Sequence, residues 1–144
     1  MNKQHKMDSL YLEIVDAVSK MSFAKRKKVG AVIVKDDNII SYGWNGTPAG
    51  DENSCEEMVD GVLRTKIGVL HAESNALMKL LRSGSGVSTS GATAYLTMGP
   101  CIHCAKMLKQ AQITRVVFKE HYRDLEGTAF LEDRGVQIEI FEKD

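Results

Sequence analysis

The sequence carries no excess of charge of either sign. Its 144 residues include 19 Lys and Arg and 19 Asp and Glu, so the formal net charge is zero. A domain whose main task is to bind nucleic acid usually has a basic surface. We therefore expect no nucleic-acid partner, although the balance still allows one small basic pocket.

Long apolar runs and a secretory leader are also missing. No segment approaches the roughly 20 apolar residues that cross a membrane. The N-terminal MNKQHKMDSL is charged and lacks the hydrophobic core of a signal peptide. These features predict a cytoplasmic protein, in the host cytoplasm if the source is a virus, without a membrane partner.

Cysteine is scarce, with three residues in the chain. The length favours a single domain, here residues 1–144, and a chain of this size buries about two thirds of its unfolded surface without needing disulfides. Cys101 and Cys104 form a C-x-x-C pair. In an unsecreted chain this spacing indicates a metal site or a redox pair.

Hydrophobic periodicity predicts alternating strands and helices. We expect a helix over residues 9–21 capped by Asp8 or Ser9, and a long loop over residues 45–68. The other expected elements are two strands in KVGAVIVKDDNIISYGW with a turn at residues 36–38, a helix from His71 with Gly84 as its C-cap, the strand ATAYLT, the helix PCIHCAKMLKQA, the strand TRVVFK, the helix GTAFLEDRG and the strand VQIEIF. This order predicts an α/β fold with helices on both faces of a largely parallel sheet, whose opening strand pair is antiparallel.

The start of the helix VLHAESNALMKLL carries two titratable residues, His71 and Glu73. Residues two apart do not share a helix face, but in the first turn both side chains can lean toward a point beyond the helix end. Cys101 and Cys104, three residues apart, share one face at the start of a second helix, where the helix dipole favours thiolates. If the two helix starts meet, one histidine and two cysteines converge.

Such a donor set fits zinc, which takes nitrogen and sulfur ligands in a tetrahedron. Three protein ligands leave the fourth position open, as in catalytic zinc sites, where the metal acidifies a water. Glu73 would then hold that water and take its proton. A redox C-x-x-C pair explains the cysteines but leaves His71 and Glu73 without a role. A closed structural site needs a fourth ligand, for which Cys55 and His103 are the nearby candidates.

The pattern H-x-E followed by P-C-x-x-C is the signature of zinc-dependent nucleobase deaminases. It stands here as His71-Ala72-Glu73 and Pro100-Cys101-Ile102-His103-Cys104. Together with VGAVIV, GWNGTPAG, HAESNAL, GATAYLT and VVFKEHY, it makes residues 29–122 resemble the deoxycytidylate (dCMP) deaminase family. The resemblance implies a cytidine-deaminase-like three-layer α/β/α sandwich with a five-stranded mixed sheet.

The resemblance also implies the reaction, which is hydrolytic deamination of dCMP to dUMP and ammonia with one Zn²⁺ per chain. His71, Cys101 and Cys104 would be the zinc ligands. Glu73 would carry a proton from water to N3 of the base and then protonate the departing amine, while the oxygen adds to C4. The expected substrate contacts are Asn45 to the sugar, the Ala72 N–H to the base O2, a carbonyl near Gly99 to the amine, Tyr122 beside the base and Lys28, in the basic run 25–28, to a phosphate.

Members of this family are often homo-hexamers that dCTP activates and dTTP inhibits. The resemblance places effector binding at Gly43, Trp44, Asn45, Gly46 and Arg82, with Mg²⁺ accompanying the triphosphate. Three alternatives stay open, namely a bifunctional dCMP/dCTP deaminase, a tRNA adenosine deaminase and a non-catalytic zinc scaffold. The resemblance also raises a second zinc, because some viral members of the family hold a structural zinc through a cysteine of the loop that contains Cys55 and a partner cysteine before VGAV. The sequence there reads AKRKK, without a cysteine, so a second zinc at Cys55 is not expected.

Overall fold

The computed structural model describes residues 2–142. Residues 1, 143 and 144 of the expected single domain lie outside this range. None of the helices in the described part of the chain combines the length and hydropathy needed to cross a membrane.

The core of the molecule is a five-stranded mixed sheet with the strand order β2-β1-β5-β6-β7. Its strands are β1 (Gly30–Lys35), β2 (Asn38–Trp44), β5 (Thr93–Met98), β6 (Arg115–Glu120) and β7 (Gln137–Ile140). The second strand in this order, β1, runs antiparallel to both β2 and β5, with Ala31 opposite Leu96, whereas β5, β6 and β7 are parallel. The mixed five-stranded sheet is therefore confirmed.

The opening strand pair is antiparallel, as expected, but the sequence did not predict that β1 is also antiparallel to β5. The chain leaves β2, passes through α2 (Ala72–Ser83) and enters β5, which runs in the same direction as β2. Because β1 lies between these two strands, it is antiparallel to both neighbours. As a result, four strands point their carboxyl ends at one edge of the sheet, where β1 begins. Ligands in open α/β sheets bind at such an edge.

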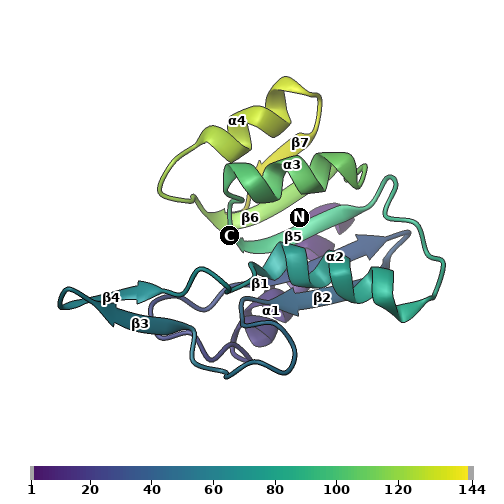
Figure 1. Ribbon diagram of the computed structural model, residues 1–144. Coiled ribbons are helices and arrows are strands. Elements are labelled where there is room, and N and C mark those ends of the chain that lie inside the picture. Colours follow the sequence, from purple (N-terminus) through teal and green to yellow (C-terminus); the bar gives the residue numbers. More distant parts are fainter. Residues whose placement is uncertain (1, 143–144) are drawn as a thin grey trace.

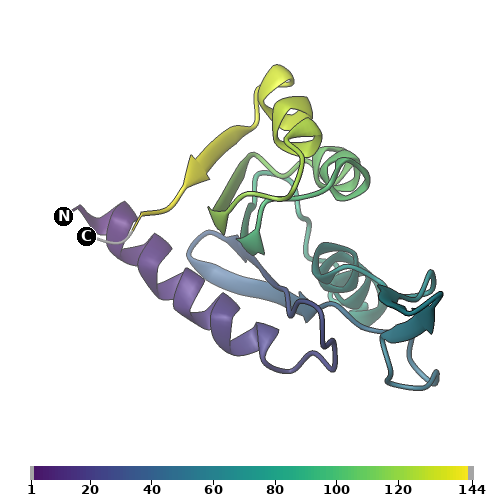
Figure 2. The ribbon, with the colours of Figure 1, turned by 90° about the vertical axis from the view of Figure 1, so that its left-hand side faces the viewer.

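Helices cover both faces of the sheet, as Figure 2 shows. The helix α1 (Lys3–Ser19) lies on one face, where Tyr11, Leu12 and Val15 pack against Val32 and Tyr95. On the other face lie α2, α3 (Ile102–Gln110) and α4 (Glu126–Asp133) (Figure 1). Their apolar side chains share a second core with residues of the sheet. The three-layer α/β/α sandwich is confirmed.

The first helix begins six residues earlier than the sequence predicts. Asn2, not Asp8 or Ser9, is its N-cap, and the Asn2 side chain accepts the His5 N–H at 2.8 Å. Asp8 is instead buried, with its carboxylate bonded to the Arg115 guanidinium and to the Tyr95 hydroxyl. Asp8 therefore does not cap the helix but fixes it to the sheet through Arg115, a residue far away in the chain.

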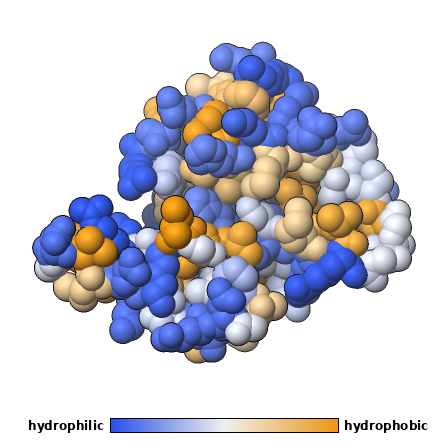
Figure 3. Space-filling view, viewed as in Figure 1, coloured by the Kyte–Doolittle hydropathy of each residue, from blue (hydrophilic) through white to orange (hydrophobic). Residues whose placement is uncertain are grey.

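Residues 45–68 are not a continuous loop. They contain a hairpin of β3 (Glu56–Val59) and β4 (Val62–Thr65), joined by a turn at Asp60-Gly61. Asp-Gly is a strong signal for a two-residue hairpin turn. The hairpin projects from the body of the molecule (Figure 1), and in Figure 3 it forms a lobe with both polar and apolar surface. Its base adjoins the edge where the strands end.

Candidate active site

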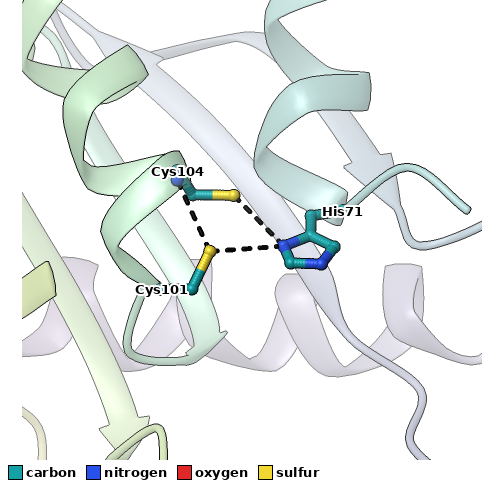
Figure 4. A group of neighbouring side chains, drawn as sticks. All are labelled: His71, Cys101 and Cys104. Atoms are coloured by element: carbon teal, nitrogen blue, oxygen red, sulfur yellow. Dashed lines mark hydrogen bonds between the residues drawn. The ribbon is translucent and has the colours of Figure 1, made fainter. Parts of the chain in front are cut away.

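Two helix starts meet at the carboxyl edge of the sheet. His71 is the N-cap of α2, Cys101 is the N-cap of α3, and Cys104 lies in the first turn of α3. The His71 Nδ1 atom is 3.3 Å from the Cys104 Sγ and 3.6 Å from the Cys101 Sγ. The three side chains point toward one another (Figure 4), and their donor atoms all lie within 4.8 Å of each other.

This donor set suits a zinc ion. It offers one imidazole nitrogen and two buried thiols, which are the ligand types that zinc prefers. The hydrogen bond between the thiols lowers the pKa of Cys101 and raises the pKa of Cys104, and the bond to Cys101 raises the pKa of His71. The three groups therefore titrate as a unit, and a metal would bind their deprotonated forms.

No fourth nitrogen or sulfur donor belongs to this group among residues 2–142. Cys55 lines the neighbouring cavity without joining the group, and His103 is exposed on α3. A three-donor site matches the open arrangement of catalytic zinc and not the closed arrangement of a structural zinc.

Glu73 lies in the first turn of α2, two residues after His71, and is only 4% exposed. Burial raises the pKa of its carboxyl, and the nearby His71 and Cys104 side chains oppose this rise. The carboxyl therefore lies directly beside the donor group. A group in this place can take a proton from a molecule at the open metal position and return it.

Glu73 and two of the three donors, His71 and Cys101, line one cavity of about 260 Å³. Four of the five expected substrate-binding residues line it, namely Asn45, Ala72, Gly99 and Tyr122. The fifth, Lys28, lines a different hollow beside Lys20. The basic side chains at the cavity are those of Arg26, Lys27 and Arg123. The run 25–28 thus does reach the cavity, but through residues other than the one selected from the sequence.

The Asn45 side chain holds the segment that contains these basic residues. Its Oδ1 accepts the Val29 N–H at 2.9 Å, and its Nδ2 donates to the Lys27 carbonyl at 2.8 Å. Glu56, which the sequence analysis did not single out, binds the same segment through the N–H groups of Lys25 and Arg26. No local pattern marks this contact, because Glu56 is about thirty residues away in the chain.

A second hollow of about 250 Å³ is lined by Gly43, Trp44, Gly46 and Arg82, four of the five residues expected to bind effectors. The fifth, Asn45, lines the first cavity instead. Gly43 also has a packing role, because a Cβ there would lie 2.6 Å from the Ala76 backbone nitrogen.

The two hollows are linked by short backbone contacts. The Gly46 N–H donates to the Leu70 carbonyl at 3.0 Å, and the Leu70 N–H donates to the Gly46 carbonyl at 2.8 Å. Leu70 directly precedes His71. In addition, the Asn75 side chain on α2 donates to the Trp44 carbonyl at 2.7 Å.

The last helix supports the cysteine segment from behind. A Cβ at Gly127 would lie 2.2 Å from the Pro100 carbonyl oxygen, so only glycine lets α4 approach this closely. The backbone that carries Cys101 is therefore fixed by α4 as well as by α3.

The comparisons with known proteins agree with this geometry. Residues 5–120 match the family model described as the cytidine and deoxycytidylate deaminase zinc-binding region. The deoxycytidylate deaminase of Mycobacterium phage D29 is 34% identical over 122 residues, which cover 77% of this chain and 92% of that protein. The deoxycytidylate deaminase of Saccharomyces cerevisiae is 32% identical, and the match covers 93% of this chain but 44% of that longer protein.

The fold is also similar to a crystal structure of the dCMP deaminase from the cyanophage S-TIM5 in complex with dCMP and dUMP. That similarity has a TM-score of 0.87 and an identity of 39%, and it covers 98% of this chain and 99% of that one.

Proposed function

This chain belongs to the family of cytidine and deoxycytidylate deaminases, and we propose that it converts dCMP and water to dUMP and ammonia in pyrimidine deoxynucleotide metabolism. One observation carries the proposal. The buried Glu73 carboxyl lies beside a His-Cys-Cys donor group, and Glu73, His71 and Cys101 line a single cavity. The similarity to a phage enzyme whose structure holds dCMP and dUMP supports the choice of substrate.

His71, Cys101 and Cys104 would hold one Zn²⁺ per chain. When bound, zinc supplies a Lewis acid that lowers the pKa of a water toward about 7. Glu73 takes a proton from the attacking water and delivers it to N3 of the base. The water oxygen adds to C4. Glu73 then takes the remaining proton from the new C4 hydroxyl and gives it to the 4-amino group. The C4–N bond breaks as the C4 carbonyl forms, and ammonia leaves. One carboxyl thus acts first as a base and then as an acid.

The cavity walls orient the nucleotide. We assign the Ala72 N–H, at the start of α2, to the base O2, and the backbone carbonyl near Gly99 to the departing amine. Tyr122 lies beside the base. Asn45 faces the sugar, although its amide is also engaged with the backbone of residues 27 and 29. These contacts hold the base with C4 toward the His-Cys-Cys group.

Arg26 replaces Lys28 as our candidate for the 5′-phosphate. Of the three basic residues at the cavity, Lys27 is paired with Glu120, and the Arg123 guanidinium lies 5.3 Å from the centre of the Tyr122 ring. Within residues 2–142, Arg26 forms no ion pair and has the Thr65 hydroxyl as a side-chain partner. A guanidinium has five N–H donors, so several remain for a phosphate.

The test is an ammonia-release assay of the zinc-loaded protein with dCMP, deoxycytidine, dCTP, CMP and an adenosine-bearing RNA hairpin. We expect dCMP to have the highest kcat/KM. Faster turnover of dCTP than of dCMP would indicate the bifunctional enzyme. Deamination of the hairpin would indicate a tRNA adenosine deaminase. Release of ammonia from none of them would leave the non-catalytic zinc scaffold as the better explanation.

We also propose that dCTP, with Mg²⁺, activates the enzyme and that dTTP inhibits it at the second hollow. Lys79 and Arg82 supply positive charge there for a triphosphate. The Gly46–Leu70 contacts next to His71 offer a physical route to the first cavity. A coupling of about 1–3 kcal/mol changes affinity about 5–150-fold, so turnover at low dCMP concentration should respond clearly.

The substitution Arg82→Glu tests this regulation, because it should weaken the response to dCTP and dTTP without loss of zinc. Turnover indifferent to both triphosphates would disprove only the regulation.

The proposal also covers the oligomeric state of the enzyme and its cellular compartment. Leu81, Met78 and Val87 are exposed along an apolar groove between α2 and α3, which supports a homo-oligomer, with a hexamer favoured. Light scattering after gel filtration would give its mass. We place the enzyme in the cytoplasm, because thiol ligands need a reducing compartment. Cell fractionation would test this assignment.

A further inference from the structure

The segment of residues 24–29, between α1 and β1, forms one wall of the catalytic cavity. Ala24, Arg26, Lys27 and Val29 line the cavity from this side. The segment belongs to no helix or strand. Side chains from other parts of the chain therefore decide how it presents its basic residues.

Glu56 supplies the main contact from the hairpin. This carboxylate is 9% exposed, and its Oε2 accepts the N–H of Lys25 at 2.8 Å and the N–H of Arg26 at 3.0 Å. Hydrogen bonds to a charged acceptor are about twice as strong as neutral ones. The next residue, Glu57, is exposed, and its side chain points to the opposite side of the strand.

Thr65 holds the side chain of the same arginine. It lies opposite Glu56 in the hairpin, and its hydroxyl accepts the Arg26 Nη1 at 3.1 Å. The base of the hairpin therefore contacts both the backbone and the guanidinium of Arg26. On the far side of Arg26, Asn45 binds the carbonyl of Lys27 and the N–H of Val29.

We propose that Glu56 is a positioning residue for recognition of the 5′-phosphate: it fixes the backbone at Lys25 and Arg26 so that the Arg26 guanidinium is presented to the cavity. The inference rests on the proposed deamination of dCMP. An arginine that is already oriented loses less conformational freedom when it binds a phosphate. Selectivity for the nucleotide over the nucleoside would then depend on the hairpin, although the hairpin carries no zinc ligand.

The experiment compares kcat/KM for dCMP with kcat/KM for deoxycytidine in the zinc-loaded protein. Glu56→Ala and Arg26→Ala should each lower the ratio of the two values at least about tenfold, as expected for loss of a charged hydrogen bond. If Glu56 acts through Arg26, the double variant should have the ratio of Arg26→Ala alone. Glu57→Ala is the matched control and should keep the wild-type ratio.

A purely structural role for Glu56 would lower both kcat/KM values alike, and an unchanged ratio in Glu56→Ala would overturn the inference. If Glu56→Ala does not fold, Glu56→Gln takes its place. Glutamine keeps the shape with a weaker, neutral acceptor, so its ratio should fall between those of wild type and Arg26→Ala, and a wild-type ratio would count against the proposal. A wild-type protein that releases no ammonia from dCMP would instead reject the proposed function.

Discussion

Asp8→Asn should destabilise the fold by about 3 kcal/mol, because it breaks a buried ion pair. The Asp8 side chain is 4% exposed, and its two oxygens accept from Arg115 Nη1 at 2.8 Å and Arg115 Nη2 at 2.6 Å. The Tyr95 hydroxyl also donates to Asp8 at 2.6 Å. Removing one partner of a buried pair costs about 3–5 kcal/mol. Since the Arg115 side chain is 14% exposed and can reach water, the lower end applies.

Thermal unfolding measures this cost. In a domain of this size each kcal/mol lowers Tm by about 3 °C, so the variant should melt about 9 °C below wild type. Asp16→Asn is the matched control on the same helix. Asp16 pairs with Lys119 at the surface, where such pairs contribute at most about 1 kcal/mol. If Asp8→Asn melts as close to wild type as Asp16→Asn does, the reasoning is refuted.

The pH dependence gives a second check on the same variant. Burial pushes the pKa of Asp8 upward, but hydrogen bonds from Arg115 and Tyr95 and the charge of Arg115 outweigh it, so the pKa is lowered on folding. The contribution of Asp8 is then complete above its unfolded-state pKa of about 3.9 and is lost as the pH falls toward the folded value. The Tm difference between wild type and variant should stay constant from about pH 7 to 5 and narrow below about pH 4. A difference that widens in acid would contradict the assignment.

Three further predictions concern the catalytic site. Purified protein should carry about one zinc per chain, and Cys101→Ser should lose both zinc and activity, whereas a content near two would indicate a second site at Cys55. Glu73→Gln should keep its zinc but deaminate dCMP at least ~10²-fold more slowly, and wild-type turnover would rule out its role in proton transfer. Gly127→Ala should cost about 1–3 kcal/mol and lower the zinc content, because its Cβ would overlap the backbone that carries the first cysteine. Gly68→Ala, where a Cβ meets nothing within 4 Å, should do neither.

Local patterns predicted much of the architecture. The strands flanking residues 36–38, the helix that ends at Gly84 and the later strand–helix alternation all occur near their expected positions. The predicted zinc ligands also meet, because each lies at a helix start next to the end of a strand, and the sheet gathers those ends at one edge. Hydrophobic periodicity and helix-capping residues are therefore sufficient to predict these strands, helices and helix starts.

The hairpin within residues 45–68 was missed for a physical reason. Each of its strands has four residues and lacks the alternation of apolar and polar side chains that marks a half-buried strand. All of its residues except Glu56 are exposed. Only the Asp60-Gly61 turn signalled the hairpin, and the many polar residues around that dipeptide favoured a loop.

Long-range partners explain the other differences. From its neighbours, Asp8 would be assigned as a helix cap, but its buried partners Tyr95 and Arg115 are 87 and 107 residues away in the chain. Lys28 was predicted to bind a phosphate because it belongs to a basic run. Which member of that run faces the cavity depends on two distant side chains, those of Asn45 and Glu56. Neither choice can be made from neighbouring residues.

The residues proposed to carry out the chemistry and those proposed to select the substrate are held in place by different kinds of contact. The donor group and Glu73 depend on contacts within two helix starts, so a short motif is enough to specify them. The cavity wall that would meet a phosphate is held by Glu56 from thirty residues away and by Asn45 from the end of β2. A relative can therefore keep the whole zinc motif and still prefer another substrate if its hairpin differs. For that reason, a change of substrate within this fold is better sought at residues 24–29 and 56–65 than in the motif itself.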